Sequence, residues 1–362
     1  MAVSATTHLS KSITSVSGQT TISSVDMGLK VSEQVLPKIF ARIAYQKGYM
    51  VNNAYDVDAQ NSLTVLIPKF GRPTGKFESI ANGSNYDPFT TTPEGTFLDY
   101  ATLNVDLEYR KPIKIAEAQI VQNVIGDKVV ATMTDYVSRT VAEQINYITA
   151  EAFYSSIVDY EGDNFVLANA KKIVAIGAQD GSNVYASVPD AMANLIAKIG
   201  NADPAKGDTS FNDYKMSQVI SNSLYAKLMT TKGQFILESS YGQEILIDGT
   251  LGRITLGDLT AYKGRILGVD TFVLPDAFFP SYGNTNFTEN PTVGKVLGVM
   301  AVAESTERVF VDRGVKITDA VDFRGWVLQP LYRVGVTCLK PWGAGLIVSS
   351  DFKNGNEPVV AG

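Results

Sequence analysis

The residue types that carry most enzyme chemistry are scarce in this chain. Its 362 residues include one histidine, His8, and one cysteine, Cys338. A Ser-His-Asp triad, a Cys-His pair or a zinc site needs such side chains in combination. We therefore expect no histidine-dependent catalysis, no metal site and no cofactor. One cysteine cannot form an internal disulfide, and we expect Cys338 to pack as a small hydrophobic residue of the core.

Paired carboxylates could still serve as the acid and base of a glycosidase-type reaction. The sequence offers two pairs, Glu304 with Glu307 and Asp319 with Asp322. Both lie in short polar segments between expected strands, and carboxylates are rarely buried without a partner. We expect both pairs to be solvated turns. The glycine-rich segment 249–252 lacks the Lys-Ser/Thr ending of a phosphate-binding loop, so we expect a turn there as well.

The composition is that of an ordinary globular protein, with 45% hydrophobic and 19% charged residues. This length can bury a substantial core in two or three subdomains. The formal charge of −6 disfavours tight general binding to nucleic acid. No run of eighteen apolar residues appears, and residues 1–20 have no signal-peptide core. We expect no membrane association and synthesis in a cytoplasm.

The elements of the first half of the chain can be predicted from composition and periodicity. Residues 1–27 are rich in Ser, Thr and Val and predict an arm without its own core. A helix is expected over 32–49 and a strand over 63–67. Alternating residues predict a second strand over 103–109. The Gly/Pro-rich excursion between these strands predicts a long extended hairpin, a kind of loop that normally needs a functional partner.

The longest helical pattern covers residues 127–158. Apolar residues recur there every three or four positions, Asp127 can cap the start, and no Pro or Gly follows until Gly162. Such a helix would extend roughly 45 Å. A mixed segment follows, with helices expected over 189–199 and 223–230 and a strand over 216–220. Short strands are expected over 244–247, 253–254 and 264–273, and residues 294–348 predict strand after strand, packed on the long helix.

This order of elements, together with the phrases GVDTFVLP (268–275) and FVDRG (310–314) and the run 324–336, resembles the major capsid proteins of tailed bacteriophages. The resemblance implies an α+β subunit of the Hong Kong 97-type capsid fold. It assigns the N-arm to 1–27 and the extended loop to 56–109. The peripheral domain would comprise 28–55 and 110–163, with the spine helix at 127–158. The axial domain would be 164–276, and 277–362 would return to the peripheral domain and end in a tail.

The resemblance also implies a function: self-assembly into the pentamers and hexamers of an icosahedral or prolate shell around double-stranded DNA. The implied partners are further copies of the chain, a separate scaffolding protein, a portal, a decoration protein and non-specifically contacted DNA. The implied location is the virion capsid, assembled in the host cytoplasm. The alternatives are an encapsulin-type nanocompartment shell protein or, in a different class, a soluble metal-free hydrolase or solute-binding protein.

The expected functional residues then lie on surfaces between subunits. Aromatic and arginine side chains of the extended loop are expected to cross an adjacent subunit, or alternatively to form a local mini-core: Phe70, Arg72, Phe77, Tyr86 and Phe89. Four arginines are expected to form inter-subunit ion pairs: Arg110, Arg308, Arg313 and Arg333. Some relatives join subunits by Lys-Asn isopeptide bonds. Lys69, Lys76, Asn354 and Asn356 supply the residue types without a matching motif.

Overall fold

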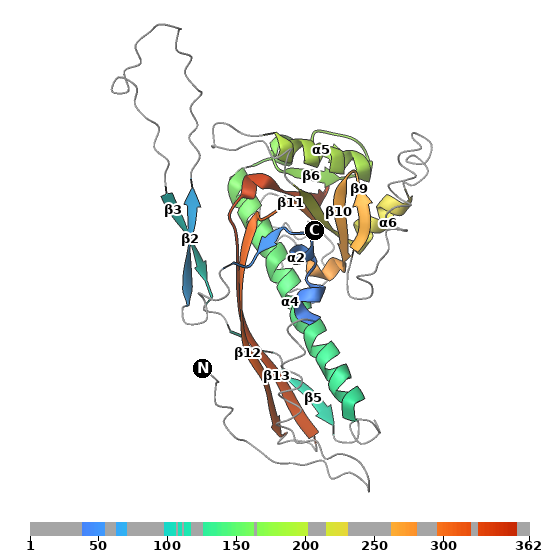
Figure 1. Cartoon of the computed structure of the whole chain (residues 1–362). Coiled ribbons are helices and arrows are strands. Elements are labelled where there is room, and N and C mark those ends of the chain that lie inside the picture. The colour runs from blue at the N-terminus through green and yellow to red at the C-terminus, as the bar shows by residue number, and fades with distance from the viewer. Residues whose placement is uncertain are drawn as a thin grey trace, which may run out of the picture.

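A long helix organises the molecule (Figure 1). The computed structural model describes residues 38–54, 63–70, 98–105, 108–110, 112–116, 126–162, 165–201, 215–230, 262–280, 295–319 and 325–352. Helix α4, Gly126–Glu161, has 36 residues and is about 54 Å long. It confirms the helix expected over 127–158. Its N-terminal half packs on one sheet through Val137, Val141 and Ile145, and its C-terminal half packs on a second sheet through Phe153 and Ile157.

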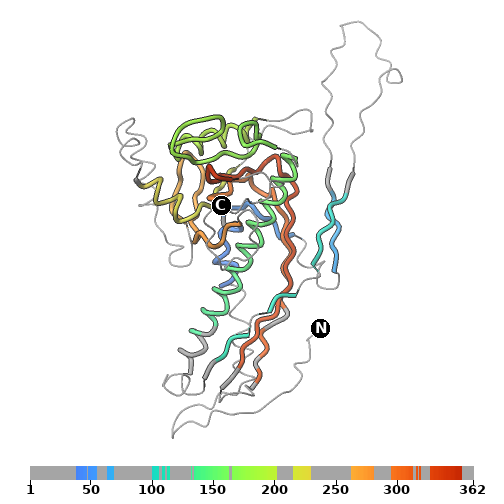
Figure 2. The backbone as a smooth tube through the Cα atoms, turned by 180° about the vertical axis from the view of Figure 1, so that it is seen from behind, coloured from blue at the N-terminus to red at the C-terminus, as the bar shows by residue number. Residues whose placement is uncertain are grey.

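A long antiparallel ladder runs along α4 (Figures 1 and 2). It consists of β12, Thr306–Asp319, and β13, Gly325–Cys338. β1, Val51–Asn52, pairs with β12, while β4, Glu108–Arg110, and β5, Ile113–Ala116, pair with β13. Phe310, Leu328 and Tyr332 bury their side chains in the same cluster as the N-terminal half of α4. The C-terminal strands therefore pack on the long helix, as expected.

The second sheet has seven strands in the order β7-β6-β14-β11-β8-β10-β9. In chain order these are β6 Ile173–Ile176, β7 Val184–Tyr185, β8 Met216–Ser221, β9 Tyr262–Ile266, β10 Val269–Leu274, β11 Val296–Val302 and β14 Ala344–Ser349. Helices α5, Val188–Gly200, and α6, Asn222–Thr230, share a core with the sheet, and α4 shares another core with it together with α2, Ala44–Lys47. Short 3-10 turns cover Leu167–Asn169, Asp276–Phe278 and Pro341–Gly343.

The centre of this sheet departs from the expected division of the chain at residue 276. β11 and β14 belong to the C-terminal segment, yet they lie between β6 and β8, which come from 164–276. The chain leaves this sheet after β11, forms the ladder of β12 and β13, and returns to the sheet as β14. The segment 277–362 is therefore shared between both sheets, because strand pairing joins residues far apart in sequence.

Two local expectations also need correction. Residues 264–273 form a hairpin, with Leu267 and Gly268 at φ 53° and 79° in the turn between β9 and β10. The helix expected over 32–49 is interrupted in its described part by extended Ile43. The Asn146 side-chain amide of α4 fills the break, accepting from the Ala44 N–H and donating to the Arg42 carbonyl. The side chain of Asn146, which is distant in sequence, thus replaces backbone hydrogen bonds of a continuous helix.

A two-stranded hairpin forms a third layer on the ladder. β2, Thr64–Phe70, pairs with β3, Leu98–Asn104, from Thr64 opposite Asn104 to Phe70 opposite Leu98. Val65, Ile67 and Leu103 bury their side chains against Val309 and Val311 of β12. This confirms the strand over 63–67. The strand expected over 103–109 is divided, because β3 ends at Asn104 and β4 pairs with β13 of the long ladder.

The expected arm 1–27 and the short strands over 244–247 and 253–254 lie outside the described residues.

Candidate functional site

Two of the side chains considered for catalysis, Cys338 and Glu307, are buried in the body of the subunit. Cys338 is buried, with its Sγ 3.6 Å from the Ser305 carbonyl oxygen, which confirms its place in the core. Among the described residues no group of three or more His, Cys, Asp and Glu side chains is placed to hold a metal ion.

The expectation of a solvated turn fails for Glu307. This residue lies on β12, is only 6% exposed and accepts a 2.8 Å hydrogen bond from the Asn52 side chain. Its burial follows from the pairing of β1 with β12, which places Asn52 directly opposite. Glu304 is exposed in the preceding turn, as expected. Asp319 ends β12, and Asp322 lies outside the described residues.

The four candidate arginines are placed very differently. Arg308 is fully buried, donates to Gln46 Oε1 at 3.0 Å and lies over the Phe40 ring. The expected inter-subunit ion pair is therefore wrong for Arg308, because its side chain does not reach the surface. Arg308 lies on the same face of β12 as Phe310. This face points toward α4, and it places Arg308 beside the Phe40 ring.

The other arginines keep their inter-subunit role as a prediction. Arg333 Nε lies 3.7 Å from Glu108 of its own chain, across the β13–β4 pair. Arg110 is exposed on β4. Arg313 lies on β12, but its side chain is not described.

The predicted contact residues of the extended loop fall almost entirely outside the described chain. Phe70 ends β2 opposite Leu98, but its side chain is not described. The other four predicted contact residues lie outside the described residues: Arg72, Phe77, Tyr86 and Phe89. Of the residues considered for a cross-link, Lys76, Asn354 and Asn356 also lie outside them, and the side chain of Lys69 is not described. Both the contact role and the cross-link therefore stay predictions.

The hairpin itself presents an apolar surface. Its face away from β12 is formed by alternate residues, which we call the outer face: Leu66, Pro68, Tyr100 and Thr102. Leu66 is 60% exposed and Tyr100 is 53% exposed. Large apolar side chains that gather on one exposed face mark interaction surfaces. The hairpin is consequently a candidate contact surface built on strands that the body of the subunit holds in place.

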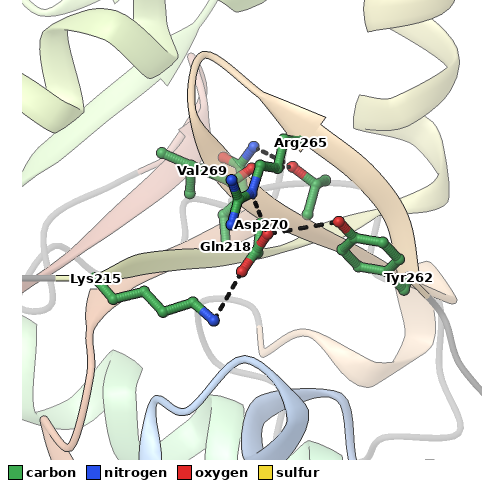
Figure 3. Close-up of polar contacts among 7 residues, drawn as sticks. Lys215, Gln218, Tyr262, Arg265, Val269 and Asp270 are labelled. Atoms are coloured by element: carbon green, nitrogen blue, oxygen red, sulfur yellow. Dashed lines mark hydrogen bonds and ion pairs between the residues drawn. The ribbon is translucent and has the colours of Figure 1, made fainter. Parts of the chain in front are cut away.

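A second candidate surface is a charged group that we call the Asp270 cluster, Lys215, Tyr262, Arg265 and Asp270 (Figure 3). Asp270 on β10 accepts from Arg265 Nε at 2.9 Å and lies 3.1 Å from Lys215 Nζ. The Tyr262 hydroxyl lies 3.5 Å away. Pairing of β10 with β8 and β9 brings these residues together.

Electrostatics keep the central carboxylate charged. Burial by itself raises the pKa of Asp270, but the hydrogen bonds and positive charges of Arg265 and Lys215 outweigh burial and hold the pKa below its ordinary value. Sequence reasoning missed this cluster. The phrase 268–275 contains Asp270, but Lys215 lies 55 positions earlier, and only the pairing of β8 with β10 brings the two together.

Within the described residues, no helix combines the length and apolar character needed to cross a membrane.

Comparison with known proteins identifies the fold. No family model matches the sequence, and no curated protein does. Among solved structures, the capsid of Ralstonia phage GP4 matches with a TM-score of 0.56 at 9% identity, covering 88% of this chain and 92% of that chain. A structure from Mycobacterium phage Ogopogo scores 0.49 at 11% identity, with coverages of 79% and 87%. A virus-like particle from Pyrococcus furiosus scores 0.45 at 10% identity, with coverages of 89% and 98%.

The Ralstonia phage match covers most of either chain. At this identity the likeness concerns the fold, and it agrees with the α+β arrangement described above. The chain therefore has the Hong Kong 97-type fold of tailed-phage capsid proteins.

Proposed function

We propose that this chain is a major capsid protein, which assembles into the pentamers and hexamers of a viral shell around double-stranded DNA. One observation carries the proposal: the fold matches the capsid of Ralstonia phage GP4 over 88% of the chain. Fold alone does not fix function. The described residues add an exposed apolar surface suited to self-association.

In this proposal the extended loop, 56–109, is the main contact with a neighbouring copy. The outer face of β2 and β3 supplies exposed Leu66 and Tyr100. The end of β2 and the loop beyond the strands would add the aromatic and arginine anchors expected from the sequence: Phe70, Arg72, Phe77, Tyr86 and Phe89. Aromatic and arginine side chains dominate the energy of many interfaces. Arg110, Arg313 and Arg333 would pair across other contacts.

The proposal extends to partners of the shell. The net charge of −6 agrees with a protein that encloses DNA and contacts it only weakly. Scaffolding protein, portal and decoration protein would be separate chains. The shell would form in the host cytoplasm and become part of the virion.

Negative-stain electron microscopy and analytical ultracentrifugation of the purified protein test the proposal. We expect closed particles of megadalton mass that are built from one 39.1 kDa chain. A monodisperse particle of one or two chains at all concentrations and salts would contradict a shell function and favour a hydrolase or solute-binding protein. Shells that form in cells but exclude DNA and retain a protein cargo would instead favour a nanocompartment.

A further inference from the structure

Among the side chains of the Asp270 cluster that the structure describes, positive charges outnumber negative charges by two to one. Two cations, Lys215 and Arg265, share the single carboxylate of Asp270. The side chain of Lys215 is 45% exposed and that of Arg265 is 65% exposed, while that of Asp270 is only 12% exposed. The anion of the cluster therefore lies underneath and the cations lie on top. This local sign is opposite to the net charge of the whole chain, −6.

The two cations border a pocket. Its volume is about 230 Å³, and its remaining lining comes from Asp270, Ile196, Met216, Gly268 and Val269. A space of this size accommodates the end of a side chain rather than one water molecule. A negative charge placed beside the two cations would be attracted to both, and Asp270, which also lines the pocket, would offset part of that attraction.

The cations are also held in position before any ligand arrives. Asp270 fixes one nitrogen of each cation, and Lys215 additionally lies 4.1 Å from the centre of the Tyr49 ring. Tyr49 itself follows α2 with a φ of 59°, which turns the chain toward this cluster. Side chains ordered in advance lose less conformational freedom on binding.

We propose that this pocket receives a carboxylate side chain of a second copy of the chain, which binds between Lys215 and Arg265. The inference rests on the proposed shell function, because it requires copies side by side. The acidic balance of the chain supports this occupant, since 37 acidic residues against 31 basic ones make a carboxylate the commonest charged group that a neighbour offers.

A matched pair of charge reversals tests the contact. Arg265→Glu reverses a cluster cation, whereas Lys263→Glu makes the same charge change at an exposed position two residues earlier on β9, outside the pocket lining. We expect Arg265→Glu to raise the subunit concentration needed for assembly about tenfold or more in 0.1 M salt. Lys263→Glu should change it less than about threefold. In 1 M salt, where the Debye length falls to about 3 Å, the difference should shrink.

A cross-linking experiment on the unmodified protein avoids any folding defect of a variant. Shells are assembled from equal parts of ¹⁴N- and ¹⁵N-labelled chain and treated with a carbodiimide, which couples an amine to a carboxylate in direct contact. Coupling within one chain, Lys215 to Asp270, gives peptide pairs of a single isotope. We expect additional Lys215 peptides that join the two isotopes.

Each result supports or overturns the inference. Mixed-isotope Lys215 peptides together with the Arg265→Glu defect support it. Shells whose Lys215 couples only within its own chain, or equal behaviour of Arg265→Glu and Lys263→Glu, overturn it while leaving the shell function intact. Normal empty shells of Arg265→Glu that retain less DNA would also overturn it and indicate a phosphate ligand. Failure of the unmodified protein to form particles would instead contradict the proposed function.

Discussion

Gly335 on β13 shows at the scale of one residue how the hairpin is held against the body. A Cβ atom at this position would lie 2.5 Å from the Asn104 carbonyl oxygen and 3.3 Å from Leu103 Cγ. Contacts under 3 Å to backbone force a shift of one strand. The absence of a side chain therefore sets the distance between β3 and β13.

We expect Gly335→Ala to lower the free energy of unfolding of the unassembled subunit by about 1–3 kcal/mol, the usual cost of overpacking. Urea denaturation measures this change. Gly181→Ala serves as the control, because its Cβ would meet nothing closer than Val184 Cβ at 3.8 Å. Equal destabilisation by the two substitutions would show that the close approach to β3 is unimportant.

Burial of single charged residues was the least predictable property at this scale. Arg308 and Glu307 look like surface charges in the sequence, yet both are buried, since β1, the Phe40 ring and Gln46 cover one end of β12. The Asp270 cluster has the same origin. Its three charges come from residues joined only by the pairing of β8, β9 and β10.

The hairpin of β2 and β3 is the element whose two faces have different roles. One face anchors on Val309 and Val311 of β12, and the outer face stays exposed. We expect the double substitution Leu66→Ser and Tyr100→Ser to leave unfolding of the subunit nearly unchanged, as exposed positions usually do. It should raise the concentration needed for assembly about tenfold, which corresponds to a loss of about 1.4 kcal/mol of contact energy.

Light scattering of assembling subunits measures that concentration. The control is Val166→Ser, which removes an apolar side chain that is 55% exposed but belongs to the segment after α4 and not to β2 or β3. If the control impairs assembly as strongly as the double variant, the outer face has no special role in the contact.

At the scale of elements, local sequence was a good guide where the periodicity was long. α4, α5, α6 and β8 agree with prediction because apolar spacing of three to four, or a short apolar run between polar turns, reflects local geometry. The single strand expected over 264–273 failed, since Leu267 and Gly268 turn the chain within an apolar run. Sheet order could not be predicted, because most pairings of the seven-stranded sheet join residues more than forty positions apart.

At the scale of the whole molecule, charge opposes assembly. Identical copies of −6 each repel one another over distances comparable to the Debye length, about 10 Å in 0.1 M salt. Close ion pairs across a contact are screened less. We therefore expect the extent of assembly to rise as salt increases from about 0.01 M to 0.2 M, measured by light scattering. Sucrose at matched osmolality is the control, and a flat response to salt would contradict a controlling role for net repulsion.

The strand order of the seven-stranded sheet has a consequence for synthesis on the ribosome. β14 and β11 separate the β7–β6 pair from β8, β10 and β9, and β14 ends at Ser349. As the chain leaves the ribosome, the β7–β6 pair cannot join β8, β10 and β9 in one sheet until β14, the later of the two central strands, has been made. A truncated translation product thus lacks a complete sheet, so only a subunit translated through β14 can offer neighbours the Asp270 cluster on a finished framework.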